Sequence, residues 1–241
     1  MPEFTPTIQA LIDKHFPPET HPYRLLEEQV ESYLSPDATV LEIGCGRAAP
    51  VLTKMKGRAA KLIGIEVIDF TVQDPDLQLL TRDVADMHGI PDNSVDLAFS
   101  RSVMEHVPDA EGAFREIARV LKPGGRYVFL TPSFYDYGSL VAAAIPNKLH
   151  PWIVRRVEGR AEADTFPTEY QCNTKRTVYR LADDHGLTVE HFRFLGQYPN
   201  YLKFNTFLFR IGCRYAKFLE RTPALHHLQG WLFATVQKPE T

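Results

Sequence analysis

A short apolar run that leads into two glycines constrains the fold of this chain more than any other stretch. Residues 39–43 are β-branched or aliphatic apart from one glutamate, a pattern typical of a buried strand in a parallel sheet. Gly44 and Gly46 come next, and glycine allows the backbone to turn sharply from such a strand into a helix. Because this turn leaves N–H groups at the helix start unpaired, the sequence predicts a polar ligand at the carboxyl end of the strand.

The glycine spacing alone does not identify this ligand. Gly44, Gly46 and Ala49 also satisfy the dinucleotide pattern G-x-G-x-x-G/A. Glu42 separates the two classes of ligand, because a carboxylate two residues before the first glycine repels a pyrophosphate and attracts a cation. S-adenosylmethionine, which carries an ammonium group and a sulfonium, is a ligand of the second class.

With Glu42 included, this stretch resembles the first motif of the class I S-adenosylmethionine-dependent methyltransferases, acid-x-Gly-x-Gly-x-Gly. Ala48 stands where that motif has its third glycine, and we expect this small residue still to allow close packing. Residues 105–107, Glu-His-Val, resemble the small-molecule group of this family that is typified by quinone-biosynthesis methyltransferases. Residues 121–125, Leu-Lys-Pro-Gly-Gly, resemble a further motif of the family. The resemblance covers residues 38–131 and implies methylation of a small molecule.

The expected elements follow the order of a doubly wound α/β fold. Strands are expected at residues 39–43, 61–66, 77–82, 95–100, 126–131, 187–195 and 230–237, and helices within 7–34 and at 51–56, 110–121 and 174–185. The resemblance implies a Rossmann-like, seven-stranded, mostly parallel sheet with the strand order 3-2-1-4-5-7-6. Residues 1–241 are then one methyltransferase domain, with a helical cover at 1–36 and insertions over the acceptor site at 132–173 and 197–229.

Residues near the carboxyl ends of the first four strands are expected to bind the cofactor. Glu66 ends the second strand about 20 residues after the glycines, where a carboxylate accepts hydrogen bonds from both ribose hydroxyls of an adenosine. In the resembling family an acid after the third strand accepts from the adenine amino group. Asp83 is in register for that role, with Asp86 as the alternative. The complete expected set is Glu42, Gly44, Cys45, Gly46, Glu66, Asp83, Val84 and Ser100.

His106 is the candidate general base, because it follows the fourth strand and because imidazole titrates near neutral pH. A base is useful if the acceptor is a hydroxyl, which we favour, whereas an amine or an activated carbon needs none. The alternative is that His106 only orients its loop. Aromatic residues and one histidine are expected either to line the acceptor pocket or to pack as an apolar core. They are Tyr23, Tyr135, Tyr137, His150 and Tyr170.

Composition and charge narrow the partners. A formal net charge of −3 gives no reason to expect nucleic acid as a partner. Cys45, Cys172 and Cys213 lack the spacing of metal ligands, so we expect no metal site and a cytoplasmic chain with reduced thiols. Cys45 is expected to pack inside the turn rather than to act as a nucleophile. The N-terminus has no signal-peptide pattern, and no apolar run reaches the roughly 18 residues of a membrane span.

The second insertion contains an amphipathic stretch. Apolar residues recur at helical spacing, and basic residues are expected on the opposite face. The apolar residues are Phe204, Phe207, Leu208, Ile211, Tyr215, Phe218 and Leu219. These basic residues are Arg210, Arg214, Lys217 and Arg221. Such a helix packs on its own domain, lies on an anionic membrane or holds a phosphate-bearing acceptor. From this face and the aromatic insertion we expect a peripheral membrane contact and an apolar or lipid-linked acceptor.

Two other functions are compatible with the sequence. An NAD(P)-dependent oxidoreductase shares the glycine turn and Glu66, but it leaves Glu42 without a role. A non-catalytic, S-adenosylmethionine-binding subunit retains every cofactor motif and uses residues 132–173 as an interface with its partner.

Overall fold

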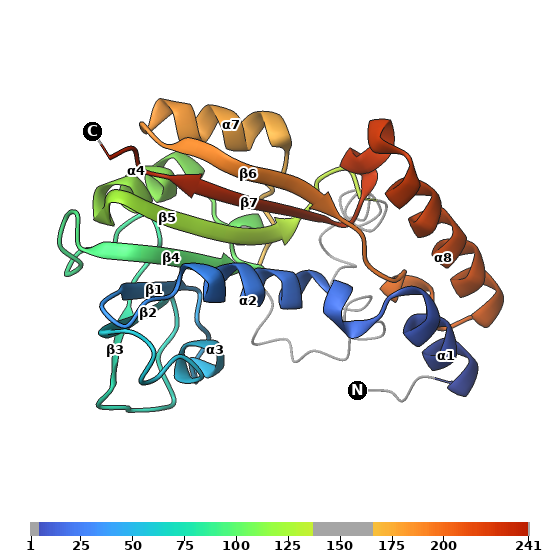
Figure 1. Cartoon of the computed structure of the whole chain (residues 1–241), viewed down its shortest axis with the longest axis horizontal. Coiled ribbons are helices and arrows are strands. Elements are labelled where there is room, and N and C mark those ends of the chain that lie inside the picture. Colours follow the sequence, from blue (N-terminus) through green and yellow to red (C-terminus); the bar gives the residue numbers. More distant parts are fainter. Residues whose placement is uncertain (1–4, 137–165, 241) are drawn as a thin grey trace. The chain divides into compact units, whose positions relative to one another are not determined.

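A seven-stranded sheet organises most of the chain, as the computed structural model shows for residues 5–136 and 166–240 (Figure 1). The strands are β1 (Thr39–Ile43), β2 (Lys61–Glu66), β3 (Leu77–Thr81), β4 (Val95–Arg101), β5 (Leu121–Pro132), β6 (Thr188–Leu195) and β7 (Trp231–Gln237). Their order is β3-β2-β1-β4-β5-β7-β6, which confirms the predicted order. The paired strands among β1 to β5 are parallel, and Figure 1 shows that β7 is antiparallel to β5 and β6.

The helices agree closely with the expected ranges. They are α1 (Pro6–His15), α2 (Pro22–Tyr33), α3 (Pro50–Thr53), α4 (Ala110–Val120), α7 (Lys175–Asp184) and α8 (Thr206–Arg221). Short 3-10 turns are η1 (Pro18–Thr20), η2 (Met104–His106), η4 (Asn200–Leu202) and η5 (Pro223–Leu228). Thr174 caps α7 by accepting from the Thr177 N–H, and Gly186, with φ +68°, follows its end. The helix after the glycine turn, α3, is shorter than expected: it ends at Thr53, whereas the sequence predicted a helix to residue 56.

Alternation along the strands gives the sheet two different faces. Phe99 of β4 pairs in register with Glu42 of β1, and both line a pocket together with residues of α2 and α3. The next residue, Ser100, pairs with Phe129 of β5, whose ring packs edge-on against Phe114 of α4 at 6.2 Å between centroids. Because successive side chains point to opposite faces of a strand, α4 covers the face opposite to α2 and α3.

The start of β5 differs from the prediction. Pairing with β4 begins at Leu121 instead of the expected Arg126, and the register shifts between these two residues. The glycines between them do not close a free turn. The Gly124 N–H donates to the Lys238 carbonyl at 2.8 Å, and the Lys238 N–H donates to the Gly125 carbonyl at 2.9 Å. These hydrogen bonds with Lys238, near the C-terminus, therefore make the Leu-Lys-Pro-Gly-Gly stretch part of β5.

The described chain divides into two compact units. The sheet unit comprises Leu26–Thr131, Glu169–Arg193 and Phe233–Thr241. The helical unit comprises Met1–Leu25, Pro132–Thr168 and Phe194–Leu232. The three segments of the helical unit overlap residues 1–36, 132–173 and 197–229, whose roles as a cover and as insertions over the acceptor site stay predictions.

The helical unit has an apolar core of its own. Ile8 and Ile12 of α1 are buried against Phe209 and Cys213 of α8. Gly212 allows η4 to lie close to α8, since a Cβ at this position would be 2.7 Å from Pro199. Among the described residues, no helix combines the length and the apolar character that crossing a membrane requires.

Candidate functional site

The glycine turn after β1 is held in a backbone conformation that glycine adopts readily. Gly44 has φ +69° and Gly46 has φ +73°. A Cβ added to Gly44 would lie 2.2 Å from Cγ2 of Val103, whereas a Cβ added to Gly46 would meet nothing within 4 Å. The segment after β4 thus packs directly on the turn at Gly44, and open space remains at Gly46. This combination fits a ligand that approaches the backbone at Gly46.

Glu66 joins the end of β2 to this turn. Its Oε2 accepts a hydrogen bond from the Gly46 N–H at 2.8 Å, and its Oε1 accepts from the Val67 N–H at 2.9 Å. Each carboxylate oxygen has a further lone pair, so both oxygens can also accept from ligand hydroxyls. The predicted ribose-binding residue therefore lies at the glycine turn, next to the open space.

Glu42 differs from the expected charged carboxylate. Its side chain is only 4% exposed, and its Oε2 accepts a hydrogen bond from the Leu52 N–H of α3 at 3.0 Å. Burial raises the pKa of the Glu42 carboxyl to about 8, although the Arg101 guanidinium opposes this shift. At neutral pH the carboxyl is mostly protonated, so its attraction for a cation is small. The hydrogen bond from the Leu52 N–H gives Glu42 a structural role, because it holds α3 against β1.

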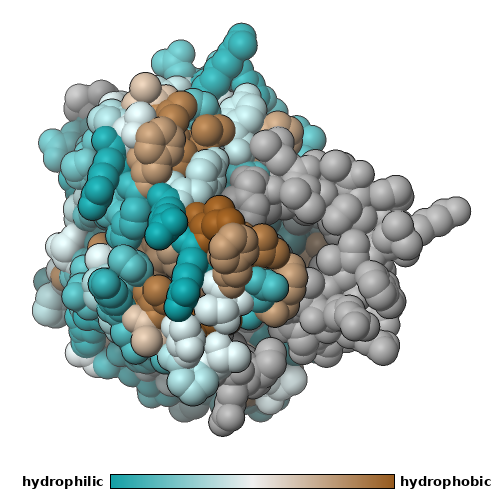
Figure 2. Space-filling model, turned by 90° about the vertical axis from the view of Figure 1, so that its right-hand side faces the viewer, coloured by the Kyte–Doolittle hydropathy of each residue, from teal (hydrophilic) through white to brown (hydrophobic). Residues whose placement is uncertain are grey.

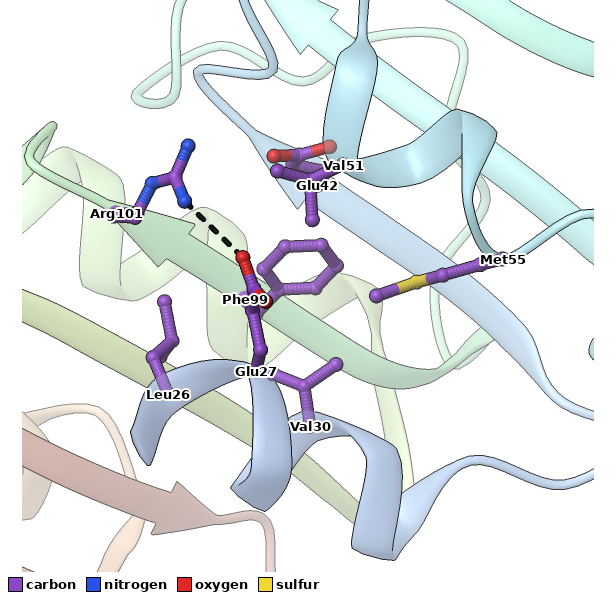
Figure 3. Close-up of a pocket in the computed structure, with 8 residues that line it drawn as sticks. All are labelled: Leu26, Glu27, Val30, Glu42, Val51, Met55, Phe99 and Arg101. Atoms are coloured by element: carbon purple, nitrogen blue, oxygen red, sulfur yellow. Dashed lines mark hydrogen bonds and ion pairs between the residues drawn. The ribbon is translucent and has the colours of Figure 1, made fainter. Parts of the chain in front are cut away.

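A small pocket adjoins Glu42 on this face of the sheet (Figure 3). Its lining residues are Leu26, Glu27, Val30, Glu42, Val51, Met55, Phe99 and Arg101. Figure 3 shows the Arg101 guanidinium directed at the Glu27 carboxylate, with 3.4 Å between Nη1 and Oε1. This ion pair ties α2 to the carboxyl end of β4, the strand whose end also carries the segment packed on Gly44.

The predicted adenine-binding segment follows β3 at the same edge of the sheet. Glu66 pairs in register with Thr81, so Asp83 lies just beyond the level of Glu66. One oxygen of Asp83 accepts from the Ala85 N–H at 2.7 Å, and Val84 between them is buried. Asp86, the alternative, lies 3.2 Å from the His88 ring. The turn orients the Asp83 carboxylate and leaves its second oxygen for a ligand.

Ser100 and Cys45 are buried in packing contacts. The Ser100 hydroxyl shares a hydrogen bond of 2.6 Å with the Tyr127 hydroxyl on the α4 face, so only its backbone can contact a cofactor. The Cys45 sulfur lies 2.8 Å from where a Cβ on Gly64 would be. Burial raises the pKa of this thiol to about 12, so the thiolate is absent at neutral pH. Cys45 fills space within the turn.

A buried polar network follows β4, and the sequence analysis did not identify it. The Thr131 hydroxyl donates to Oε2 of Glu105 at 2.9 Å, and the Asn173 amide donates to the Thr131 oxygen at 2.8 Å. All three side chains are buried. The only sequence signal was the acid of the Glu-His-Val stretch, because Thr131 and Asn173 are remote from it along the chain.

This network brings two predicted site residues together. The backbone N–H groups of Glu169 and Tyr170 donate to the Glu105 carbonyl, at 2.7 Å and 3.2 Å. The Nε2 atom of His106 lies 3.8 Å from Oε1 of Glu105, and the His106 side chain is 29% exposed. Tyr170 has φ +51°, an uncommon value for a non-glycine residue. His106 therefore lies beside the buried Glu105 carboxyl group, Tyr170 is bonded to the main-chain carbonyl of the same residue, and the imidazole remains accessible to solvent.

Two other predicted acceptor residues belong to the helical unit. Tyr23 packs edge-on against Trp231 within the helical unit, with 5.4 Å between ring centroids. Tyr135, in the same unit, packs edge-on against Phe134 and His227. Both residues make ring contacts with neighbours in this unit, and their role as acceptor residues stays a prediction. Tyr137 and His150 lie outside the described residues.

Comparison with known proteins agrees with this geometry. Residues 41–129, which contain the glycine turn, Glu66, Asp83 and His106, match the family model described as a methyltransferase domain. Residues 41–129 carry a methyltransferase domain. The strand order of the sheet is that of the S-adenosylmethionine-dependent methyltransferases that the sequence resembles.

Individual relatives match the methyltransferase domain or the fold. A sterol 24-C-methyltransferase of Aspergillus fumigatus is 32% identical over 111 residues, which are 40% of this chain and 29% of that protein. The chain thus spans less than a third of this relative. A geranyl diphosphate C-methyltransferase from Streptomyces coelicolor has the same fold, with 18% identity, a TM-score of 0.56 and coverage of 99% of this chain and 85% of that one.

The fold is shared with a protein of another activity as well. The (4+2)-cyclase SpnF matches with a TM-score of 0.56 and 16% identity over 90% of this chain and 81% of that one. A fold common to a cyclase and a methyltransferase does not by itself establish methyl transfer. The assignment of a reaction therefore depends on the match to the methyltransferase domain and on the residues at the carboxyl ends of the parallel strands.

Proposed function

We propose that this protein transfers a methyl group from S-adenosylmethionine to a small-molecule acceptor. The observation that carries the proposal is the methyltransferase-domain match over residues 41–129, together with the Glu66 carboxylate at the open turn. Glu42 no longer separates a cationic ligand from a dinucleotide, because its carboxyl is mostly neutral at pH 7. The cofactor assignment therefore depends on the family match.

The turn residues have distinct roles in this proposal. Glu66 binds the ribose hydroxyls, Asp83 accepts from the adenine amino group, and Gly46 lets the ligand approach the backbone. Glu42 supports α3 from beneath. When bound, S-adenosylmethionine supplies a methyl group that its sulfonium already activates. The protein has to align the acceptor with that group and to exclude water.

Calorimetric titration with S-adenosylmethionine, S-adenosylhomocysteine, NADH and NADPH tests the cofactor. We expect micromolar dissociation constants for the first two ligands and no heat of binding for the nicotinamides. Binding of the nicotinamides alone would overturn the methyltransferase proposal in favour of an oxidoreductase. A chain that binds the first two ligands but methylates nothing would be the non-catalytic subunit.

The proposed acceptor is apolar or lipid-linked. Support comes from the names of the relatives, which give a sterol and geranyl diphosphate as acceptors. We also propose a cytoplasmic location, because Cys45, Cys172 and Cys213 are free and buried thiols. The names of these relatives specify a carbon atom as the site of methylation, whereas our proposal favours a hydroxyl oxygen, with His106 as the base that accepts its proton.

Substitution of His106 by glutamine tests the proposed base. For a hydroxyl acceptor, we expect His106→Gln to lower the rate of methyl transfer about 100-fold, because the variant lacks a group that accepts the hydroxyl proton. The dissociation constant of S-adenosylmethionine is expected to stay unchanged. The assay uses radiolabelled S-adenosylmethionine with a panel of apolar alcohols and phenols, followed by NMR analysis of the product.

The matched control is His191→Gln, which removes an exposed histidine from β6. We expect the control to behave as the wild type does. An unchanged rate of methyl transfer in His106→Gln would reduce His106 to a residue that orients its loop. A C-methylated product would reject the hydroxyl acceptor.

A further inference from the structure

Helix α8 presents three faces, although the sequence predicted two. One face is buried against the helical unit and consists of Phe209, Gly212, Cys213 and Leu219. Of these, only Leu219 belonged to the apolar face that the sequence predicted. The tertiary structure therefore selects a different side of the helix for burial.

The predicted apolar residues instead form an exposed stripe. Phe207 is 70% exposed, Ile211 48% and Phe218 54%. With about 100° between successive helix positions, these three residues fall within about 40° of one another around the axis. Phe204, just before the helix, is 76% exposed. Single exposed apolar residues are common on protein surfaces, whereas a cluster of large ones indicates an interaction surface.

The basic residues lie beside this stripe rather than opposite to it. Arg210, Arg214 and Arg221 each follow a stripe residue by three positions, which places them about 60° to one side. All three are exposed, and none of them forms an ion pair with any residue in the described part of the chain. The solvent-facing side of α8 is therefore an apolar stripe with a positively charged flank.

Lys217 does not belong to this flank. Its ammonium pairs with Glu220 at 2.7 Å and lies 4.9 Å from the centre of the Phe16 ring. These contacts engage Lys217 with α1 and with its own helix. The flank thus has three of the four cations that the sequence indicated.

Figure 2 looks at the molecule from the side on which α8 lies in Figure 1. Strongly hydrophobic side chains reach the surface there and adjoin strongly hydrophilic ones. Such a surface suits the boundary between lipid headgroups and acyl chains, where aromatic and aliphatic groups enter the apolar layer and cations meet anionic headgroups. A second copy of the chain would place like charges near one another, because the same three arginines would meet across a two-fold interface.

We propose that the exposed face of α8 docks on an anionic lipid surface, with Phe207, Ile211 and Phe218 entering the interface and Arg210, Arg214 and Arg221 binding headgroups. The helix lies in the plane of the surface and does not cross it. This proposal goes beyond the methyl transfer proposed above and does not depend on it, since lipid binding needs no cofactor.

Flotation of the full chain with lipid vesicles, without cofactor, tests the docking. The vesicles contain phosphatidylcholine alone or phosphatidylcholine with phosphatidylglycerol. We expect binding to the anionic vesicles at low salt and at least about a tenfold loss of binding in Arg210→Glu plus Arg214→Glu, because each basic residue near the surface contributes substantially to attraction. Phe207→Ser plus Phe218→Ser is expected to weaken binding by a similar factor, and about 1 M salt to weaken it strongly, since the screening length is then about 3 Å.

Two controls use exposed residues of the sheet unit. Lys54→Glu plus Arg176→Glu makes the same change in net charge, and Tyr179→Ser removes an aromatic side chain that is 43% exposed. We expect both controls to bind like the wild type.

The proposal is wrong if the wild type ignores anionic vesicles, or if the α8 variants bind as well as the wild type does. Sedimentation analysis tests the alternative that a second copy of the chain binds to this face of α8. A dimer that dissociates in Phe207→Ser, with no vesicle binding, would assign the face to a second copy of the chain.

Discussion

Replacement of Glu66 by alanine is expected to weaken the binding of S-adenosylmethionine about 100-fold or more. Hydrogen bonds to a charged group contribute about 1.5–3 kcal/mol each, and two ribose hydroxyls would lose their acceptor. The variant also loses the hydrogen bond from the Gly46 N–H at 2.8 Å, which helps to hold the turn in its ligand-binding shape. Calorimetric titration of the purified variant measures the change.

Two further variants separate binding from folding. Glu66→Gln keeps one carbonyl oxygen for the Gly46 N–H, and we expect its affinity to be intermediate. Asp69→Ala removes an exposed carboxylate three residues later and is expected to bind like the wild type. Thermal melting shows whether each variant is folded. If the folded Glu66→Ala variant binds S-adenosylmethionine with a dissociation constant within about threefold of the wild-type value, Glu66 does not bind the ribose and the proposed cofactor site is wrong.

Replacement of Glu42 by glutamine is expected to stabilise the fold above neutral pH by several kcal/mol. The pKa of this carboxyl is about 8 in the folded protein and 4.5 as a free side chain, because burial disfavours the charged form. The folded state therefore holds a proton that the unfolded state releases. The stabilisation is complete below about pH 4.5 and is lost as the pH rises through about 8, at up to about 1.4 kcal/mol per pH unit.

Glutamine removes this dependence while keeping the contacts. Its carbonyl oxygen can still accept from the Leu52 N–H, and Arg101 retains its ion pair with Glu27. The free energy of unfolding in urea, measured from pH 4.5 to pH 9, is expected to show similar values for both proteins at the acidic end and a difference on the order of 4 kcal/mol at the alkaline end. Other titrating groups affect both proteins alike and cancel in the difference.

Asp37→Asn, which changes an exposed acid just before β1, serves as the control and is expected to follow the wild type at every pH. Parallel curves for Glu42→Gln and the wild type would show that the Glu42 carboxyl ionises as an ordinary exposed acid does. The buried, neutral carboxyl inferred above would then be wrong.

Much of the sheet could be predicted because its signals are local. The bounds of β1 and β2 follow from short apolar runs, and the glycine turn requires only that Gly44 and Gly46 follow such a run. Glu66 is placed by the parallel pairing of β2 with β1, which puts both strand ends at one edge. The resemblance supplied the strand order, which the structure confirms.

The parts that could not be predicted depend on residues remote in sequence. The start of β5 is decided by Lys238, and the network at Glu105 is completed by Asn173. The sequence places Glu42 in a strand, but only packing under α3 and beside Arg101 makes its carboxyl mostly neutral. A pKa reflects solvation and neighbouring charge, neither of which a linear pattern contains.

Helix α8 illustrates the same division. The sequence by itself determined that residues 206–221 form an amphipathic helix with aromatic and basic residues, since helical periodicity is a property of neighbouring positions. Only the tertiary structure decided which side is buried, because α1 packs against Phe209 and Cys213 and leaves Phe207 and Phe218 in solvent. Periodicity shows that a helix has faces, whereas the surface available for burial depends on where the rest of the chain lies.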